Sequence, residues 1–194
     1  MLKAKPAAVS KVRIIGGKWR GRKLLIADEV GLRPSLDRVR ETLFNWLQSH
    51  IAGAHCLDLF AGTGALGFEA LSRGAASVTM VEQSRVCIET LKKQANILQG
   101  EHLKIVKEEA IAYLEVSNKK FDIVFLDPPF SKNLLPRACE TLLNRGHLRP
   151  DAFVYIESDN KTLSSEQLKV SKQARAGNVY YALLQSRVGR ETEE

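Results

Sequence analysis

From residue 55 onward, short apolar runs alternate with segments of helical periodicity, and this alternation limits the fold more than any other feature of the chain. Runs rich in Val, Ile, Leu and Phe predict strands over residues 55–60, 76–82, 103–107, 121–126 and 152–158. The segments between them predict helices over residues 65–74, 84–98, 109–115 and 133–145. Strands that are apolar along their length and alternate with helices form a parallel sheet covered on both faces.

Both ends of the chain depart from this alternation. Residues 168–188 read as two strands joined by a turn at residues 176–178, which predicts an antiparallel hairpin that closes the sheet. Residues 12–17 and 22–27 predict a second hairpin, and apolar residues at helical spacing predict a helix over residues 36–50 that packs on the main domain. We therefore expect an α/β fold with a doubly wound, seven-stranded, mostly parallel sheet, an antiparallel terminal hairpin and an N-terminal β-hairpin extension.

Length and composition exclude several classes of protein. With 194 residues, 44% of them apolar, the chain is long enough for one domain with a full core. No apolar run approaches the length of a membrane-spanning helix, and the N-terminus lacks the apolar segment of a secretion signal. Cys56, Cys87 and Cys139 are too widely spaced for a disulfide framework, and the four histidines lack metal-ligand spacing. We expect a cytoplasmic protein with no metal and no membrane partner.

Positive charge is concentrated near the N-terminus. Residues 1–40 hold eleven Lys or Arg and three acids, a net charge of +8, whereas the other 154 residues hold 18 basic and 19 acidic residues, a net charge of −1. A basic arm on a near-neutral body predicts a polyanionic partner such as nucleic acid, although a charged arm can also serve only to solubilise the chain. We expect residues 1–30 to form a basic arm and hairpin, residues 31–188 the main domain and residues 189–194 a tail.

The connector of the N-terminal hairpin interleaves cations with an aromatic side chain. Such a pattern can bind phosphates while the ring stacks on a base. The alternative is that Trp19 packs on the main domain, and the sequence leaves both interpretations open. The candidate nucleic-acid contacts in this region are Arg13, Lys18, Trp19, Arg20, Arg22 and Lys23.

The first strand of the alternating part runs into the sequence DLFAGTGALG, residues 58–67. Gly62, Gly64 and Gly67 satisfy the spacing of a dinucleotide-binding turn, in which glycine lets the backbone approach a ligand closely. Asp58 stands just before this turn, however, where a carboxylate would repel the pyrophosphate of NAD. A carboxylate suits a cationic ligand, and S-adenosyl-L-methionine carries both a sulfonium and an ammonium group. The charge pattern therefore favours S-adenosyl-L-methionine over NAD as the cofactor.

Acids also follow the next two strands. Glu82 can accept hydrogen bonds from both ribose hydroxyls of a bound nucleoside, with a surface acid in a loop as the alternative. Glu108 and Glu109 follow the strand over residues 103–107, where one of them can accept the adenine amino group. A solvated acid at the start of a helix is the alternative there, and we prefer Glu109 for the adenine contact.

The sequence FLDPPF, residues 125–130, closes the fourth strand with an acid, two prolines and an aromatic residue. The prolines fix φ and remove two backbone donors, so Asp127 and the Pro128 carbonyl present two rigid acceptors. The exocyclic amine of a base has two N–H donors that match them, and Phe130 offers a flat surface for that base. A rigid loop without catalytic function is the alternative, since proline pairs are common in turns.

Two acceptors on an exocyclic amine explain how such a site would work. They localise the nitrogen lone pair and stabilise the positive charge that develops on nitrogen during attack on a methyl group. A methyl group on a sulfonium is already a strong electrophile, so the reaction requires no metal. The target base must leave its stack or be unpaired beforehand, at a cost on the order of a few kcal/mol.

Several long motifs in a fixed order extend over nearly the whole chain: RIIGGKWRGRKL, LRPSLDRVRETLFNWL, LDLFAGTGALGFEALSRGA, VEQS, FLDPPF and YIE. On these motifs the chain resembles the class I S-adenosylmethionine-dependent methyltransferases, and within them the bacterial 16S rRNA guanine-N2 methyltransferases of the methyltransferase D family. The resemblance implies a Rossmann-like fold and methylation of one guanine in 16S rRNA, in the small ribosomal subunit or a late precursor. We expect a monomer.

The resemblance also implies roles for individual residues. Glu82 would hold the ribose and Gln83 would lie beside the adenine. Arg33 falls in the family's RPT-like segment, near cofactor or substrate, and the family commonly has Asp or Asn where Glu109 stands. The residues that would line the cofactor loop are Asp58, Phe60, Ala61, Gly62 and Gly64. The residues that would handle the target base are Asp127, Pro128 and Phe130.

Two other functions fit parts of the sequence. An adenine-N6 methyltransferase acting on DNA or another RNA would share the DPPF motif, although such DNA enzymes often carry a larger target-recognition region. A non-catalytic RNA-binding assembly factor would share the fold. The intact glycines, together with Asp58, Glu82 and Asp127, argue against this second alternative.

Overall fold

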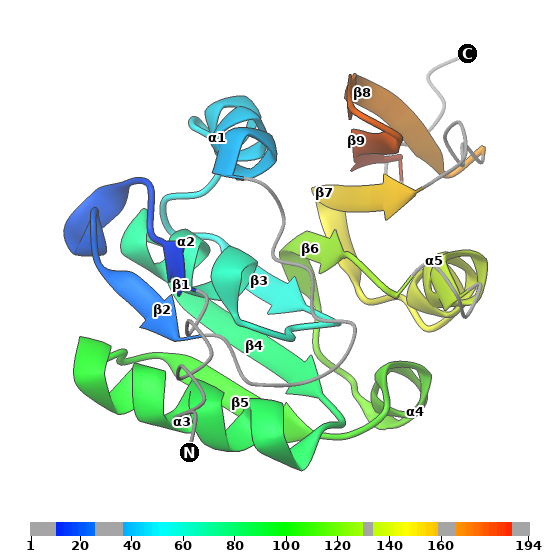
Figure 1. The fold of residues 1–194 in the computed structure, drawn as a ribbon. Helices are drawn as coiled ribbons and strands as arrows, with labels where there is room; N and C mark the ends of the chain where they lie inside the picture. The colour runs from blue at the N-terminus through cyan, green and yellow to red at the C-terminus, as the bar shows by residue number, and fades with distance from the viewer. Residues whose placement is uncertain (1–10, 26–36, 130–133, 159–165, 188–194) are drawn as a thin grey trace, which may run out of the picture.

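The chain folds around one seven-stranded sheet, which Figure 1 shows in a computed structural model. The structure describes residues 11–25, 37–129, 134–158 and 166–187. The strand order across the sheet is β5-β4-β3-β6-β7-β9-β8, with parallel pairing from β5 to β7 and antiparallel pairing of β9 with β7 and β8. The strands are β3 (His55–Asp58), β4 (Ser77–Glu82), β5 (Leu103–Lys107), β6 (Phe121–Leu126), β7 (Leu148–Ser158), β8 (Leu168–Ala176) and β9 (Val179–Ser186). The predicted fold class is confirmed.

Helices cover both faces of the sheet, because the strands are apolar on both faces. The described helices are α1 (Asp37–Trp46), α2 (Ala65–Ser72), α3 (Arg85–Leu98), α4 (Ala110–Val116) and α5 (Leu134–Asn144). Side chains of α1, α2 and α3 pack in one core cluster, and those of α4 and α5 pack in a second cluster on the other face. Figure 1 shows these two groups of helices on opposite sides of the sheet. This double covering is what the alternating pattern predicts.

Local capping sets where several helices begin and end. Ser84 precedes α3 and its side chain accepts a hydrogen bond from the Cys87 amide, as the sequence predicts for a helix opened by serine. Gly74 follows α2 with φ +96°, a left-handed conformation that suits glycine at the end of a helix. Helix α1 is shorter than the predicted 36–50, because the chain turns after Trp46.

The N-terminal hairpin is also shorter than predicted. Its strands are β1 (Lys11–Arg13) and β2 (Lys23–Leu25), joined through a 3-10 turn over Gly17–Trp19. The chain can turn this tightly because Gly17 has φ +74°, and an added Cβ there would lie 1.8 Å from the Ser72 carbonyl oxygen. Residues 26 and 27 of the predicted second strand lie outside the described residues. So do the predicted domain boundaries near residues 30 and 188, which stay predictions.

Strand β7 begins four residues earlier than predicted, at Leu148 rather than at residue 152. Leu148 pairs with Phe121 of β6, and the register then shifts before Phe153 pairs with Ile123. Asp151 lies in this irregular part with φ +59°. A polar Arg-Pro-Asp sequence therefore extends the strand through a bulge, which an apolar pattern does not reveal.

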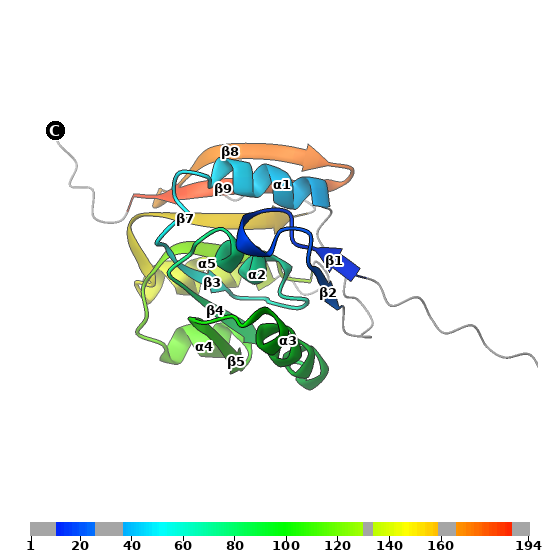
Figure 2. The same cartoon turned by 90° about the vertical axis from the view of Figure 1, so that its left-hand side faces the viewer.

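Strand polarity decides which residues can meet. Strands β3 to β7 are parallel, so their carboxyl ends lie at one edge of the sheet, and the β8–β9 turn lies at that same edge because β9 is antiparallel to β7. Figure 2 shows this edge on its right-hand side, with the turn between β8 and β9 above the ends of the parallel strands. We call this edge the carboxyl rim.

Candidate active site

The acids singled out in the sequence converge at the carboxyl rim. Asp58 ends β3, Glu82 ends β4, Glu109 follows β5 and Asp127 follows β6. These four strands are neighbours in the order β5-β4-β3-β6, so the acids lie on adjacent strands, roughly 4.8 Å apart across the sheet. Asp58 lies about two residues before Glu82 and Asp127 along the strands, because it pairs with Met80 and Phe125. The strand order therefore brings these residues to one end of the sheet, and their membership of one ligand site stays a prediction.

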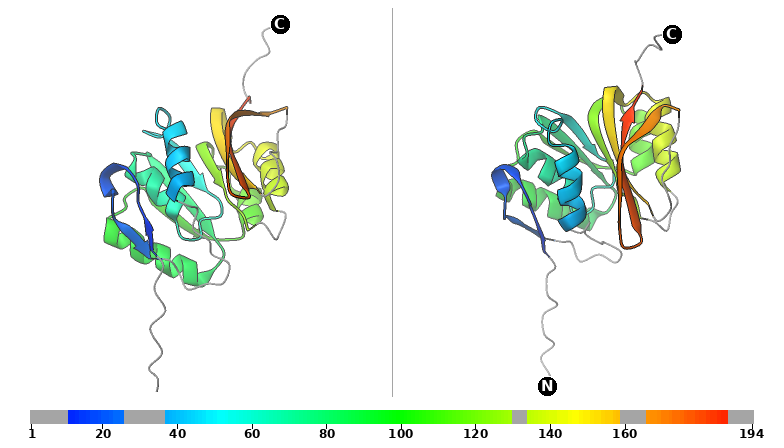
Figure 3. Two further views of the ribbon diagram at one scale, coloured as in Figure 1. Left: turned by 45° about the horizontal axis from the view of Figure 1, so that its top comes forward. Right: turned by 90° about the horizontal axis from the view of Figure 1, so that it is seen from above.

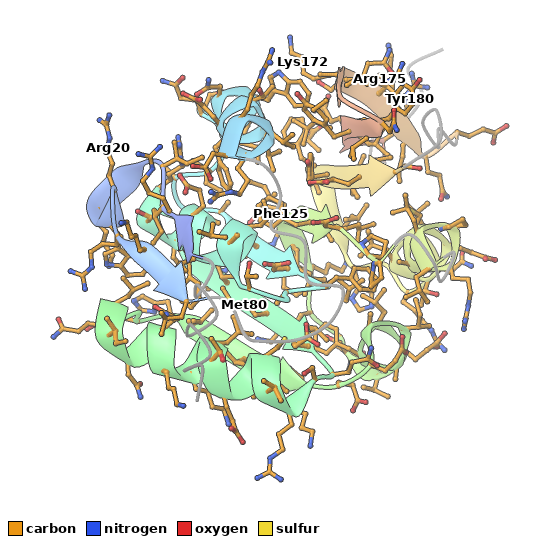
Figure 4. The ribbon with its side chains drawn as sticks, in the orientation of Figure 1. Arg20, Met80, Phe125, Lys172, Arg175 and Tyr180 are labelled. Carbon is orange, nitrogen blue, oxygen red and sulfur yellow. The ribbon has the colours of Figure 1, made fainter. Side chains whose placement is uncertain are left out.

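The loop after β3 is shaped by glycines. Gly62 and Gly64 have positive φ, +49° and +76°, which other residues adopt with strain. A Cβ on Gly64 would lie 2.5 Å from Leu91, and a Cβ on Gly67 would lie 2.4 Å from the Met80 side chain, which Figure 4 labels. The glycines therefore let this segment pack closely against the buried side chains of β4 and α3, while Gly62 is only half-buried. Within it, Phe60 is half-buried and Ala61 is buried.

Asp58 is a buried acid at the start of this loop. Asp58 is only 2% exposed, and its Oδ2 accepts a hydrogen bond from the Gly67 amide at 3.0 Å. Burial raises the pKa of Asp58 to about 7, the bond from Gly67 opposes the shift, and the nearby Glu82 adds to it. A cation bound beside Asp58 would favour its ionised form. The carboxylate also occupies the start of α2, where a pyrophosphate would otherwise bind.

Glu82 ties the end of β4 to the glycine loop. Its Oε2 accepts from the Gly62 amide at 2.8 Å, and its Oε1 accepts from the Ser84 amide at 2.8 Å. A carboxylate offers about four acceptor positions, so each oxygen retains capacity for a further donor such as a ribose hydroxyl. The two backbone bonds fix the orientation of the side chain before a ligand arrives.

Glu109 is the N-cap of α4, and its Oε2 accepts from the Ala112 amide at 2.9 Å. Glu109 therefore serves as an acid at the start of a helix, which was the alternative role, and its contact with the adenine stays a prediction. Gln83, also predicted to lie beside the adenine, is exposed between β4 and α3. Its location at the carboxyl rim is compatible with that role.

Asp127 stands half-buried one residue beyond β6, between the rim positions of β3 and β7. Pro128 is buried and Pro129 is exposed, whereas Phe130 lies outside the described residues. Phe125 anchors the strand from below, since it is fully buried and its ring centroid lies 5.9 Å from that of Phe44. The acid and the first proline are therefore held at the rim by a packed strand, and their catalytic roles stay predictions.

Glu157 is a further acid at the carboxyl rim, which the sequence pattern did not single out. Glu157 lies near the end of β7 and is only 6% exposed, and the Tyr155 hydroxyl donates a hydrogen bond to its Oε1 at 2.7 Å. Burial raises the pKa of Tyr155 well above its usual value, and Glu157 and Asp127 raise it further. The motif YIE quoted for the family contains both residues. The position of Glu157 could have been predicted from the acid near the end of β7 only if the pairing of β7 with β6 had been known.

The cations of the N-terminal hairpin lie in different surroundings. Arg20 and Lys23 are exposed, and Arg13 is exposed with Nη2 3.6 Å from Asp37. Arg22 donates to the Ile97 carbonyl at 3.3 Å, and Lys18 lies 4.6 Å from the Trp19 ring centroid. The predicted contact Arg33 lies outside the described residues.

The structure contradicts the interpretation of Trp19 as a base-stacking residue. The residue is 8% exposed and belongs to the core cluster under α1, α2 and α3. Its amide donates to Ser72 Oγ at 2.9 Å, and its ring packs beside Gly100, just before β5 begins. Trp19 therefore packs on the domain, as the alternative held. The connector lies near the amino end of β5, at the opposite end of the sheet from Asp127.

The described part of the chain contains neither a candidate metal cluster nor a candidate membrane-spanning helix. No group of three or more His, Cys, Asp or Glu residues there is arranged so that it could hold a metal ion. None of the described helices combines the length and the apolar character needed to cross a membrane.

Comparison with known proteins identifies relatives over almost the whole chain. A family described as "Conserved hypothetical protein 95" matches residues 12–185. Ribosomal RNA small subunit methyltransferase D of Escherichia coli K12 is 42% identical over 188 residues, covering 95% of each chain. The protein of the same name from Haemophilus influenzae is 42% identical over 187 residues, covering 93% of this chain and 97% of the relative.

A solved structure agrees with these relatives. The structure of the putative methyltransferase yhhF from Escherichia coli superimposes with a TM-score of 0.84 at 43% identity, covering 91% of this chain and 98% of that chain.

Proposed function

The chain belongs to the family of the small-subunit ribosomal RNA methyltransferases D, and on that premise we propose that it transfers a methyl group to the exocyclic N2 of a guanine in 16S rRNA. Family membership makes the chain an rRNA methyltransferase. We propose the target atom, the methyl donor and the substrate, which is the small subunit or a late precursor of it. We also propose that the protein acts in the cytoplasm and as a monomer.

The residues of the carboxyl rim fit S-adenosyl-L-methionine as the methyl donor. The glycine loop keeps its conformation because Gly64 has φ +76° and lies so close to Leu91 that an added Cβ would meet it at 2.5 Å. Glu82 retains acceptor capacity for the ribose hydroxyls, and Asp58 suits a cationic group because positive charge nearby favours its ionised form. When bound, this cofactor supplies a methyl group on a positively charged sulfur, which takes the electrons of the broken carbon–sulfur bond.

Asp127 and the carbonyl of Pro128 carry the proposed chemistry of the protein itself. They would accept hydrogen bonds from the two N–H groups of the guanine N2 amine and direct its lone pair away from the ring. The nitrogen forms the new bond to the methyl carbon, and the proton that it then loses passes to Asp127 or to water. Interactions of this kind strengthen as charge develops on the nitrogen, so they stabilise the transition state more than the bound substrate.

The observation that carries this proposal is the position of Asp127. It follows β6, the strand paired directly with β3, so it lies about one strand spacing from the start of the glycine loop. A target amine bound there would lie beside the cofactor loop, as a positioning mechanism requires. Pro128 fixes the backbone at this point and is buried.

Product identification tests the proposal. Unmodified small subunits and naked 16S rRNA are incubated separately with the protein and S-adenosyl-L-methionine labelled in its methyl group, and the RNA is then digested to nucleosides. We expect the label in N2-methylguanosine. Label in N6-methyladenosine would instead establish the adenine-N6 alternative, and RNA binding without any methylated nucleoside would establish the assembly factor.

A further inference from the structure

The hairpin formed by β8 and β9, Leu168–Ser186, is basic although the chain beyond residue 40 has a net charge of −1. It contains Lys169, Lys172 and Arg175 and no acidic residue. All three cations are exposed. Among the residues that the structure describes, none of the three is in an ion pair with a carboxylate. We call this element the C-terminal hairpin.

Strand pairing places the turn of the C-terminal hairpin at the carboxyl rim. Tyr180 pairs with Ser158 at the end of β7, and Arg175 pairs with Tyr180. Leu126, the last residue of β6, pairs with Ile156 two residues before Ser158. Three strand spacings, about 14 Å, separate β6 from β8, so Arg175 lies within reach of a nucleotide next to one bound at Asp127. Figure 2 shows the turn at the same end of the sheet as the parallel strand ends.

Arg175 is held in position by its neighbours. Its guanidinium carbon lies 4.9 Å from the Tyr180 ring centroid, and its Nε donates to the Gly177 carbonyl at 2.8 Å. No described residue accepts a hydrogen bond from its two terminal nitrogens. A planar guanidinium fixed in this way has a fork of donors that matches the oxygens of a phosphate.

Lys172 adds a second cation on the other face of the hairpin. It pairs with Leu183, whose side chain belongs to the core cluster on the α1 side, whereas Arg175 and Tyr180 share the opposite face near the turn. Figure 4 shows Lys172 next to α1, with Arg175 and Tyr180 farther along the hairpin. The two cations therefore offer two separate points of contact along a polyanion.

Edge protection is the competing explanation, because β8 is an edge strand and lysines on an edge strand deter the addition of another strand. That explanation accounts for Lys169 and Lys172 along the strand. It does not account for Arg175, which is stacked on Tyr180 at the turn and already bonded to the Gly177 carbonyl. It also predicts aggregation, and no loss of RNA affinity, when the cations are removed.

We propose that the C-terminal hairpin is an RNA-binding surface in which Arg175 binds a phosphate of the strand that carries the target base and Lys172 binds a second phosphate. This inference rests on the proposed function, because that function makes RNA the partner. The distribution of charge along the sequence predicts RNA contacts only near the N-terminus, whereas this inference places RNA contacts at the carboxyl rim as well. Phosphate contacts of this kind set the position of the strand and carry no sequence information.

A charge-matched pair of double variants tests the inference. Lys172→Gln with Arg175→Gln removes two charges at the C-terminal hairpin, and Lys119→Gln with Lys120→Gln removes two exposed charges before β6, at the amino ends of the strands. Binding of a fluorescein-labelled, single-stranded RNA is measured over a range of salt concentrations. Size-exclusion chromatography of each variant checks for aggregation.

We expect the first variant to lower the slope of log K against log salt by about 1.4, which is two phosphate contacts at about 0.7 each. Its affinity at 0.1 M salt should fall roughly tenfold, and KM for unmodified subunits should rise while kcat holds. The control variant should keep the slope of the wild-type protein. Equal slopes and affinities for the two variants would overturn the inference, as would aggregation of the first variant with RNA affinity intact.

The nucleoside product of the wild-type protein separates this inference from the proposed function. If N2-methylguanosine forms and the two variants bind RNA equally, only the inference fails. If no methylated guanosine forms, the proposed function fails, and the comparison of slopes still decides whether the hairpin binds RNA. Arg175→Lys should lose less affinity than Arg175→Gln, because it keeps the charge and gives up the planar fork.

Discussion

The N-terminal and C-terminal hairpins both carry cations, and they lie on either side of α1, as Figure 3 shows from above. The N-terminal hairpin belongs to the segment of net charge +8, yet its backbone and its aromatic residue are bonded inward to α2. The C-terminal hairpin holds three cations in a body of near-zero charge, and strand pairing brings its turn to the carboxyl rim. Charge counted along the chain thus identifies a class of partner, whereas sheet topology identifies which cations lie near the chemistry.

Glu69 is the centre of the inward contacts of the N-terminal hairpin. It is fully buried, and it accepts from the Ile15 and Gly16 amides at 2.7 and 2.8 Å and from Arg73 Nε at 2.7 Å. Arg40, also fully buried, lies with Nη1 3.8 Å from the same carboxylate. One acid therefore holds the hairpin, α1 and α2 together. Truncation of residues 1–27 would remove the two hairpin amides from this network and part of the core, so it cannot isolate a binding role for the arm.

The largest expected effect is on stability, from Glu69→Gln. The change removes the carboxylate that pairs with Arg73 and leaves the buried Arg40 with Asp37, which is half exposed, as its remaining carboxylate partner. We expect the free energy of unfolding to fall by about 3–5 kcal/mol in urea denaturation. Glu89→Gln is the control, since Glu89 pairs with Arg85 on the surface of α3 and its loss should cost less than about 1 kcal/mol. Similar losses in both variants would mean that the hairpin is not anchored through Glu69.

The next effect concerns pH at the carboxyl rim. The folded protein holds a proton on Asp58 up to a pKa of about 7, whereas the unfolded chain loses it near 3.8, so stability from this group falls as pH rises from about 4 to about 7. Between pH 5 and 8 the wild-type protein should lose about 3 kcal/mol relative to Asp58→Asn, which has no such group. Thermal or urea unfolding of both proteins without cofactor measures the difference. Parallel pH profiles would show that Asp58 is ionised in the fold.

A smaller effect is expected from Trp19→Leu. A core role for Trp19 predicts a loss of stability, whereas a base-stacking role predicts a loss of RNA affinity. Because the indole is packed in the core, the free energy of unfolding should fall by about 2 kcal/mol while the affinity for single-stranded RNA stays unchanged. If Trp19 instead stacked on a base, RNA affinity should fall by about 1–3 kcal/mol. Fluorescence anisotropy with labelled RNA, at a temperature where the variant is folded, distinguishes these results.

The smallest expected effect comes from the exposed cations of the connector. Lys18→Gln with Arg20→Gln should lower RNA affinity by less than about 1 kcal/mol, because these side chains lie at the end of the sheet away from Asp127. The measurement is the same salt titration used for the C-terminal hairpin. A larger loss here than from Lys172→Gln with Arg175→Gln would reverse the comparison and make the N-terminal hairpin the main RNA contact.

Much of the fold could be predicted because its signals are local. Strands β5 and β6 have the predicted bounds, since apolar runs with clear ends define them. The acids Asp58, Glu82 and Asp127 could be found because they stand at the ends of such runs. These elements follow from short stretches of sequence in which periodicity and turn residues agree.

The features that escaped prediction depend on contacts distant in the sequence. The burial of Trp19 requires α2 and the segment before β5, more than fifty residues away. The rim position of Glu157 requires the pairing of β6 with β7, and the site near Arg175 requires the pairing of β7 with β9. Glu109 shows a further limit, since an acid at a strand end can serve the next helix as its N-cap.

Single-turnover methyl transfer by Asp127→Asn tests the central claim most directly, because this change keeps the shape of the side chain and removes its charge. Transfer to unmodified small subunits is followed with labelled S-adenosyl-L-methionine, and calorimetry measures cofactor binding to the same variant. We predict that the rate falls by about 10²–10³-fold while the Kd for the cofactor changes by less than about twofold. A rate close to that of the wild-type protein, with cofactor binding intact, would contradict the assignment of Asp127 as the acceptor for the target amine.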